Sequence, residues 1–290
     1  KKYGINCPKD GTYFNQDDGQ VEAAYHAVVD FLSEQGIYCL TTNRVIQLTR
    51  EEVLEAVREA PAEIAIGTGR DVRVMRRRRI EEHEALSHVP GHHAPFSEEL
   101  GPLCVKNLAM IPSADLIEGF NFRVVDGREI YGMPMEAYAS RRQLAWLREG
   151  VRKAGRPGLA VALYPISTRS PVLLAPMDPD YGLRRTDGLL LTMLPDVKME
   201  QDMLTAAIVY TDYGAFTRGA GTGQAGGFCG GIEGAVIEAV CQLLGGWICY
   251  RDRFGPVGTG RVMTRSIERL APEPDTYWGS SLVCQVLNRY

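Results

Sequence analysis

Residues 155–170 limit most strongly what this chain can fold into, because they place an apolar run between a helix end and a polar exit. Gly155 and Pro157 end the amphipathic helix expected over 135–154, since glycine suits the residue after a helix and proline cannot continue one. Residues 159–164 form an unbroken apolar run, which is typical of a strand buried on both faces. Helix, tight turn, buried strand and polar loop form one unit of a parallel α/β fold, whose sites lie where strands end.

The same alternation of helices and strands continues through most of the chain. It predicts a TIM (β/α)8-type barrel of class α/β over residues 61–290, with residues 1–60 as an N-terminal helical cap that forms one structural unit with it. Only five or six barrel strands can be counted, so the barrel is either irregular or incomplete at its C-terminus. The expected helices are 18–35, 49–60, 97–108, 135–154, 188–200, 232–247 and the last residues; the expected strands are 37–39, 45–48, 63–66, 115–118, 159–164 and 204–210.

Composition excludes several classes of protein. The net charge of −4 gives no general attraction to nucleic acid or anionic lipid, and no apolar run approaches the roughly 20 residues that a membrane span needs. Seven cysteines are scattered without a C-x-x-C pair, which favours reduced thiols in a cytoplasmic protein. We therefore expect no nucleic-acid partner, no membrane and a cytoplasmic location.

Polar side chains that follow the expected strands are the candidates for chemistry. Asp212 follows the strand expected over 204–210, where a partly desolvated carboxylate would act as a general base or as the counter-ion of a cation; the alternative is an aspartate that caps the next turn. Nearby tyrosines would hold a methylated ammonium by cation–π attraction, or would be ordinary core and rim aromatics. The catalytic candidates are Asp212 and Tyr164; the substrate-binding candidates are Glu118, Arg123, Tyr210, Tyr213 and Gln224, with Asn121 beside them.

Three other patterns have two interpretations each. Residues 221–226 match G-x-G-x-x-G, but the helix does not follow at once, so a loop that lets the backbone approach a ligand closely is favoured over a dinucleotide site. The arginines at 76–79 form either a solvated edge or a docking patch for an acidic partner. The four histidines of the loop after them, His83, His88, His92 and His93, lack the carboxylate or thiolate spacing of a zinc site. A mobile polar loop is favoured over a zinc site, and we predict no metal.

Several short blocks, in order and nearly at the family's spacing, make the chain resemble the monomethylamine:corrinoid methyltransferases of methylotrophic archaea and some bacteria. No single block is distinctive, but the ordered set from residue 2 to about 257 is specific. The blocks are Lys-Tyr-Gly at 2–4, Gly-Ile-Tyr-Cys at 36–39, Thr-Arg-Glu-Glu at 49–52, Gly-Thr-Gly-Arg-Asp at 67–71, Gly-Arg-Pro-Gly at 155–158, Gly-Gly-Phe-Cys-Gly-Gly-Ile-Glu at 226–233 and Gly-Pro-Val at 255–257.

The resemblance implies a TIM barrel that moves a methyl group from methylamine to the cobalt of a cognate corrinoid protein docked over its mouth. The cobalamin then belongs to the partner, and the chain itself binds no cofactor. The family's pyrrolysine would match Ala162 and its catalytic glutamate would match Ala220 or a neighbour. Since neither position carries the family's group, the resemblance implies a substrate other than monomethylamine, such as a quaternary ammonium, which needs no adduct to become a leaving group. We also expect a homo-oligomer.

Two alternatives remain open at the level of sequence. In the first, the barrel has lost methyl transfer and binds a small molecule or a protein. In the second, it carries out unrelated lyase or hydrolase chemistry, which requires a metal or a base that the pattern does not reveal.

Overall fold

The computed structural model describes residues 2–78, 82–83, 87–91, 95–132, 134–177, 182–226, 229–254, 260–264 and 273–290. Its centre is a parallel sheet in the order β11-β9-β8-β5. Bridges at His88, Gly91 and Phe96 add a parallel segment beside β5 and the residues after it. The strands are β5 (Leu116–Glu118), β8 (Ala160–Leu163), β9 (Gly188–Leu190) and β11 (Phe216–Arg218); β12 (Gly221–Ala225) follows β11 after two residues and pairs in parallel with β13 (Gly260–Thr264).

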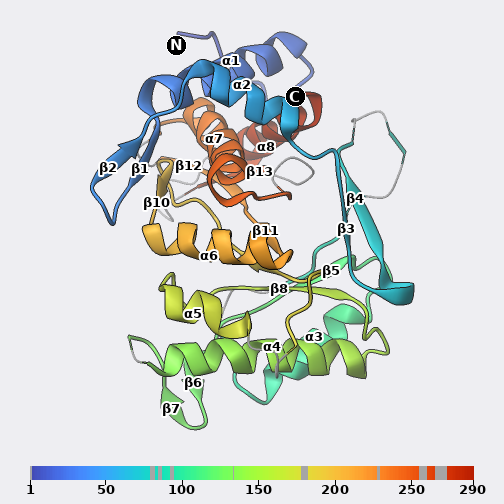
Figure 1. Cartoon of the computed structure of the whole chain (residues 1–290). Helices are drawn as coiled ribbons and strands as arrows, with labels where there is room; N and C mark the ends of the chain where they lie inside the picture. The colour runs from blue at the N-terminus through green and yellow to red at the C-terminus, as the bar shows by residue number, and fades with distance from the viewer. Residues whose placement is uncertain are drawn as a thin grey trace.

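Helices lie outside these strands and connect them. Figure 1 shows α3 and α4 at the bottom of the view, α6 in the middle and α7 and α8 above. Parallel strands joined by outer helices confirm the predicted α/β barrel architecture. The helices are α3 (Leu100–Ala109), α4 (Met135–Lys153), α5 (Ser170–Leu174) with the short η2 (Ala175–Met177), α6 (Gln201–Tyr213), α7 (Ile232–Tyr250) and α8 (Glu273–Arg289).

The N-terminal segment packs on α7 and α8, at the top of Figure 1. It consists of α1 (Asp18–Gln35), β1 (Ile37–Cys39), β2 (Arg44–Ile46) and α2 (Arg50–Glu59). Thr49 and Glu52 form the expected capping box at the start of α2. Because β1 pairs in parallel with β10 (Lys198–Met199), this segment is also hydrogen-bonded to the main body. The division of the chain at residue 60 stays a prediction.

A hairpin of β3 (Glu63–Ile66) and β4 (Arg73–Arg76), with the 3₁₀ turn η1 (Gly69–Asp71) between them, covers the amino ends of the barrel strands. Its inward residues Ile64, Ile66 and Met75 share one buried cluster with residues of β5, β8 and β11. A smaller hairpin, β6 (Val124–Val125) with β7 (Arg128–Glu129), follows β5. The end of the barrel under the first hairpin is thus filled with apolar side chains.

Three sequence-based assignments of secondary structure are wrong. Residues 204–210 lie in α6, because Met203, Ala206, Ala207 and Tyr210 are buried at helical spacing, a period that the continuous apolar run conceals. Part of the helix expected over 188–200 is β9, which is buried on both faces. The glycine-rich stretch contains strand β12.

The glycines of β12 allow close packing on α7. A Cβ at position 223 would lie 1.7 Å from the carbonyl oxygen of Ala235, so only glycine fits there. Helix α7 has the length and apolar character of a membrane span, but 67% of the relevant window is buried inside the protein. Burial of this kind is typical of a core helix, which is how α7 packs here.

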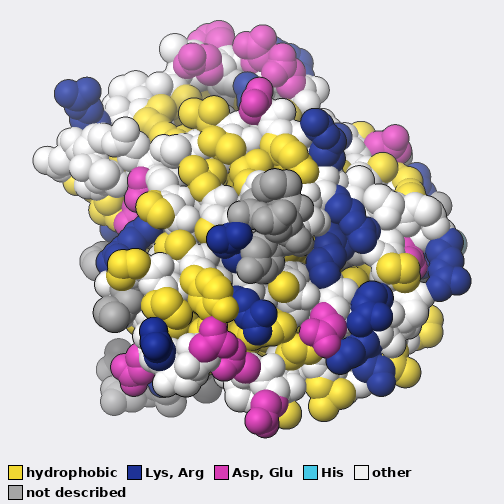
Figure 2. Space-filling view, turned by 60° about the horizontal axis from the view of Figure 1, so that its bottom comes forward, with side chains coloured by type: hydrophobic (Ala, Val, Ile, Leu, Met, Phe, Trp, Pro, Cys, Tyr) yellow, Lys and Arg dark blue, Asp and Glu magenta, His cyan; other side chains and the backbone are white. Residues whose placement is uncertain are grey.

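Charge is unevenly distributed over the surface. On the face in Figure 2, lysine and arginine side chains gather toward the right, while acidic side chains lie toward the top and lower edge. Within the basic run after β4, Arg76 pairs with Glu82, and Arg77 donates to the carbonyl oxygen of Tyr290. The backbone N–H of Arg78 donates to Asn288, so this run joins β4 to α8; Arg79 lies outside the described residues.

Candidate functional site

Two of the sequence blocks meet at the amino ends of the strands and have a structural role. The carboxylate of Asp71 accepts hydrogen bonds from the backbone of Gly158 at 3.0 Å and from Nε of Arg156 at 3.3 Å. The other guanidinium nitrogens of Arg156 donate to the carbonyl oxygens of Ala109, Ile111 and Ala114. The Gly-Thr-Gly-Arg-Asp and Gly-Arg-Pro-Gly blocks therefore lock the hairpin, α3 and β8 together.

A second buried carboxylate ties β8 to β9 at this same end. Asp187 is fully buried. It accepts from the backbone N–H groups of Val161 and Arg184 and pairs with Arg148 of α4. Satisfied backbone donors around a buried carboxylate indicate a structural joint.

The opposite end of the barrel contains a cavity of about 780 Å³. It lies at the carboxyl ends of β5, β8, β9 and β11, the end at which barrel enzymes bind their substrates. Apolar residues such as Ile166, Leu190 and Met203 form part of its wall. Its polar lining residues are Glu118, Asn121, Tyr164, Ser167, Thr168, Thr192, Arg218 and Thr222.

An ion pair forms the charged part of this cavity. Glu118 is the last residue of β5, and Arg218 is the last residue of β11. The guanidinium Nη1 of Arg218 donates to the carboxylate of Glu118, whose side chain is 5% exposed. Among the described lining residues, Glu118 is the only carboxylate and Arg218 the only cation. Two opposite charges thus meet in a site of low dielectric, where electrostatic interactions are strong.

The positions of these side chains depend on neighbouring buried groups. Arg218 precedes Gly219, whose N–H donates at 2.7 Å to the fully buried Asp252. Ser167 donates its hydroxyl hydrogen at 2.8 Å to Glu136, a buried residue of α4. The carbonyl oxygen of Tyr164 accepts from Gln143 at 2.8 Å. The cavity is therefore held by the outer helices and by the corner between β11 and β12.

The structure brings two of the predicted site residues, Glu118 and Tyr164, to the cavity, together with Asn121. Arg123 is exposed on the loop beyond and is not among the lining residues. Gln224 shares a face of β12 with Thr222, but its recorded hydrogen bonds are backbone contacts with Glu238 and Cys229. The chemical roles assigned to Glu118 and Tyr164 stay predictions.

The predicted placement of Asp212 at the barrel mouth is wrong. Asp212 is exposed in the last turn of α6. Its neighbour Tyr213 donates to the carbonyl oxygen of Leu183 and lies under Arg185, just before β9. A barrel helix runs antiparallel to its strands, so the end of α6 lies at the amino ends, far from the cavity. Tyr213 is therefore also outside the site.

Tyr210 is a core residue and not a cation binder. Its side chain is fully buried against α5, and its hydroxyl donates to the carbonyl oxygen of Leu173 at 3.1 Å. Burial raises the pKa of this phenol above its ordinary value, so it stays neutral. The predicted role of Tyr210 in substrate binding is wrong for this reason.

Ala162 lies beside the site but does not open into it. It is the register partner of Glu118 on one side and of Gly188 on the other. Its methyl group is fully buried in the apolar cluster with Ile64, Leu116 and Phe216. Ala162 is not among the residues that line the cavity. Its match with the family's pyrrolysine stays a prediction. Ala220, in contrast, lines the cavity.

Sequence reasoning missed Arg218, the main cation of the cavity. The sequence signal is Phe-Thr-Arg after Gly214, a short strand with a polar end. Recognition of α6 as a helix that ends at Gly214, whose φ is 90°, would have identified this strand.

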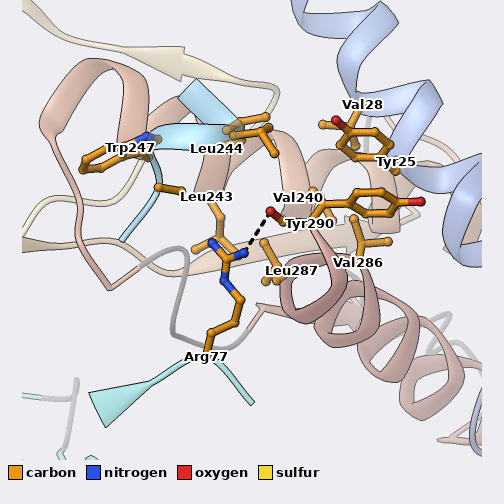
Figure 3. Close-up of a pocket in the computed structure, with 12 residues that line it drawn as sticks. Tyr25, Val28, Arg77, Val240, Leu243, Leu244, Trp247, Val286, Leu287 and Tyr290 are labelled. Carbon is orange, nitrogen blue, oxygen red and sulfur yellow. Dashed lines mark hydrogen bonds between the residues drawn. The ribbon is translucent and has the colours of Figure 1, made fainter. Parts of the chain in front are cut away.

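A second, much smaller cavity lies between the N-terminal helices and α7 and α8 (Figure 3). Its volume is about 40 Å³, so it holds little more than one water-sized group. Apolar side chains and the guanidinium group of Arg77 line it, and the rings of two lining residues, Tyr25 and Tyr290, stack with their centroids 3.7 Å apart. It is a packing gap between elements and not a substrate site.

The histidine segment shows no metal site in its described part. No group of three possible ligands occurs among the described residues. The backbone N–H of His88 donates to the carboxylate of Asp115, and Nδ1 of its ring is hydrogen-bonded to the hydroxyl of Ser113. His92 and His93 lie outside the described residues.

The fold and the cavity together define an α/β barrel with a polar site at the carboxyl ends of its strands. Residues 1–266 match the family model for the monomethylamine methyltransferase MtmB. The chain belongs to this family.

The relatives agree with this assignment at low identity. The chain is 25% identical over 262 residues to MtmB2 of Methanosarcina acetivorans. This match covers 89% of the chain and 57% of the relative. It is 27% identical over 243 residues to an MtmB2 of Methanosarcina barkeri, covering 83% and 52%. The chain thus spans a little over half the length of these relatives.

Among solved structures, the fold resembles the crystal structure of the Methanosarcina barkeri monomethylamine methyltransferase MtmB with a TM-score of 0.87 and 21% identity. The match covers 100% of this chain and 62% of that chain. The hydroxylamine complex of MtmB matches equally well. These similarities confirm the fold.

Proposed function

We propose that the protein transfers a methyl group from a methylated amine, other than monomethylamine, to the cobalt of a corrinoid protein. Membership in the MtmB family supports the class of reaction. The observation that carries the proposal is the cavity at the carboxyl ends of the strands, with the buried carboxylate of Glu118 inside it. A buried carboxylate favours a cation over a neutral ligand.

The proposed work of this chain is binding and orientation. Glu118 acts as the counter-ion of the substrate nitrogen, and the ring of Tyr164 adds cation–π attraction worth about 0.5–2 kcal/mol. Apolar wall residues exclude water and turn the methyl group toward the cavity opening. Fixed orientation of this kind can supply much of the rate enhancement of a two-substrate reaction.

The transfer breaks one C–N bond and forms one carbon–cobalt bond. A cobalt(I) corrinoid, as the methyl acceptor, supplies the electron pair of the new carbon–cobalt bond. The pair of the broken C–N bond stays on nitrogen, which leaves with one methyl group fewer. A quaternary ammonium leaves as a neutral amine, so it requires no proton from the protein.

The test uses cob(I)alamin as the acceptor and follows methyl-cobalt(III) formation by absorbance with a panel of mono-, di-, tri- and tetramethylated amines and of betaines. We expect turnover with at least one of the more highly methylated compounds and none with monomethylamine. Glu118→Gln should lower kcat/KM at least about 100-fold, since a desolvated charge partner is lost.

Arg123→Met is the matched control, because Arg123 lies outside the cavity; its rate should equal that of the wild type. Methyl transfer from none of the compounds would contradict the proposal and favour a barrel that only binds its ligand. Turnover of monomethylamine would contradict the substrate assignment.

A further inference from the structure

Arg218 has donor groups that the protein itself does not use. Its Nη1 donates to Glu118, but Nε and Nη2 have no recorded partner in the described part of the chain. Its side chain is 17% exposed, and the residue lines the cavity. Neither nitrogen is among the buried side-chain atoms that lack a partner, so the unused edge of the guanidinium group is open to the cavity.

Arg156 shows that partial burial alone does not leave the donors of a guanidinium group without partners. Arg156 is 14% exposed, and all three of its guanidinium nitrogens have protein partners. A guanidinium group left with free donors in a buried site is arranged to bind a ligand with matching acceptors. Nearby, Oδ1 of Asn121 is also buried without a partner.

The two unused nitrogens match a carboxylate best. A planar carboxylate can accept from Nε and Nη2 in parallel. Arg218 and Glu118 together carry no net charge, so a zwitterion with one carboxylate and one ammonium group keeps the site neutral, whereas a phosphate dianion would leave excess negative charge. A ligand with only a positive charge would leave these donors unused.

The size of the cavity also favours a ligand larger than methylammonium. Methylammonium has two non-hydrogen atoms and takes up about 60 Å³, at about 30 Å³ per water-sized group. The cavity has a volume of about 780 Å³. A trimethylated amino acid, at about 240 Å³ on the same basis, fills more of it and displaces more water.

We propose that the substrate carries a carboxylate together with its methylated nitrogen, as an N-methylated amino acid or betaine does. The carboxylate binds Nε and Nη2 of Arg218, and the charged nitrogen lies on the side of Glu118. The nature of the methyl donor rests on the proposed function, whereas the carboxylate site depends on Arg218 alone. Transfer removes one methyl group as described above, so a trimethylated amino acid yields the dimethylated one.

The test compares glycine betaine with choline by isothermal titration calorimetry. Both carry the same trimethylammonium group, and choline has a hydroxyl in place of the carboxylate. We expect the protein to bind betaine at least about 10-fold more tightly than choline, as a charge-assisted hydrogen-bonded pair requires. Arg218→Met should abolish this preference, and Arg123→Met should leave it unchanged.

A second variant separates loss of the ligand contact from damage to the fold. Glu118→Gln combined with Arg218→Met removes both charges, so no unpaired buried charge remains; its melting temperature should stay close to that of the wild type, and the betaine preference should be absent. Equal affinity for betaine and choline in the wild type, no betaine binding, or a preference that survives Arg218→Met would overturn the inference.

Methyl transfer distinguishes this inference from the proposed function. If betaine binds through Arg218 but no methyl-cobalt forms from any compound, the carboxylate site stands and the methyltransferase proposal fails. If choline or a simple methylamine is demethylated without any preference for betaine, methyl transfer stands and the carboxylate site is wrong.

Discussion

The two ends of the barrel contain the same kind of ion pair in different surroundings. At the amino end, Asp71 and Arg156 are surrounded by backbone groups, and every guanidinium nitrogen of Arg156 has a protein partner. At the carboxyl end, Glu118 and Arg218 face a cavity, and Arg218 uses one of its three nitrogens. The two arginines are therefore almost equally buried, but Arg156 has a complete set of protein contacts and Arg218 has an incomplete set.

A structural charge and a functional charge differ in how fully the protein itself satisfies them. A buried charge costs free energy unless it is paired and hydrogen-bonded. Arg156 meets this requirement within the protein, so it contributes to a rigid joint. Arg218 meets it only in part, and a ligand can supply the remainder. Satisfaction of donors, more than burial, identifies the functional end of the barrel.

The largest expected effect is at the amino end. Asp71→Ala leaves Arg156 and the N–H of Gly158 without their buried acceptor. We expect the free energy of unfolding to fall by about 3–5 kcal/mol, the cost of breaking a buried pair on one side, as measured by urea denaturation. A loss below about 1 kcal/mol would show that this joint is not structural.

Arginine-to-lysine substitutions at the two ends should have different effects on stability. Arg156→Lys removes most of four hydrogen bonds and should lower the free energy of unfolding by about 2–4 kcal/mol. Arg218→Lys keeps a cation beside Glu118 and should cost less than about 1 kcal/mol, while betaine affinity falls. Urea denaturation and calorimetry of both variants check this; similar stability losses at the two positions would remove the distinction.

The smallest effect is expected at Asp212. It is exposed and lies outside the cavity, so Asp212→Asn should change the free energy of unfolding by less than about 0.5 kcal/mol. The rate of methyl transfer should also be unchanged. A large loss of activity would restore a role for this carboxylate and place the chemistry at the other end of the barrel.

Local pattern was sufficient for much of the architecture. The helix at 135–153 has a clear apolar stripe, and the strand at 160–163 has a continuous apolar run between turn residues. Both were predicted from a few neighbouring residues. The strand ends then led correctly to Glu118, Asn121 and Tyr164 as cavity residues.

One local error accounted for the misplacement of Asp212 and Tyr213. The run at 204–210 is apolar enough for a strand, yet Ile208 on its outer side is 69% exposed. Only packing shows which of its residues face the core. A strand over 204–210 would place Asp212 and Tyr213 at the carboxyl end of the barrel. As the end of a helix, these residues lie at the amino end, and Arg218 ends the strand that follows.

Near neighbours and ordered short blocks are sufficient to predict the alternation of helices and strands, the capping of α2 and the likeness to the MtmB family. The folded chain alone shows that Glu118 and Arg218, 100 residues apart, form one pair and that Arg218 keeps unused donors. The physical reason is that strand order and the hydrogen-bond partners of a buried group are set by long-range packing, which no local pattern records.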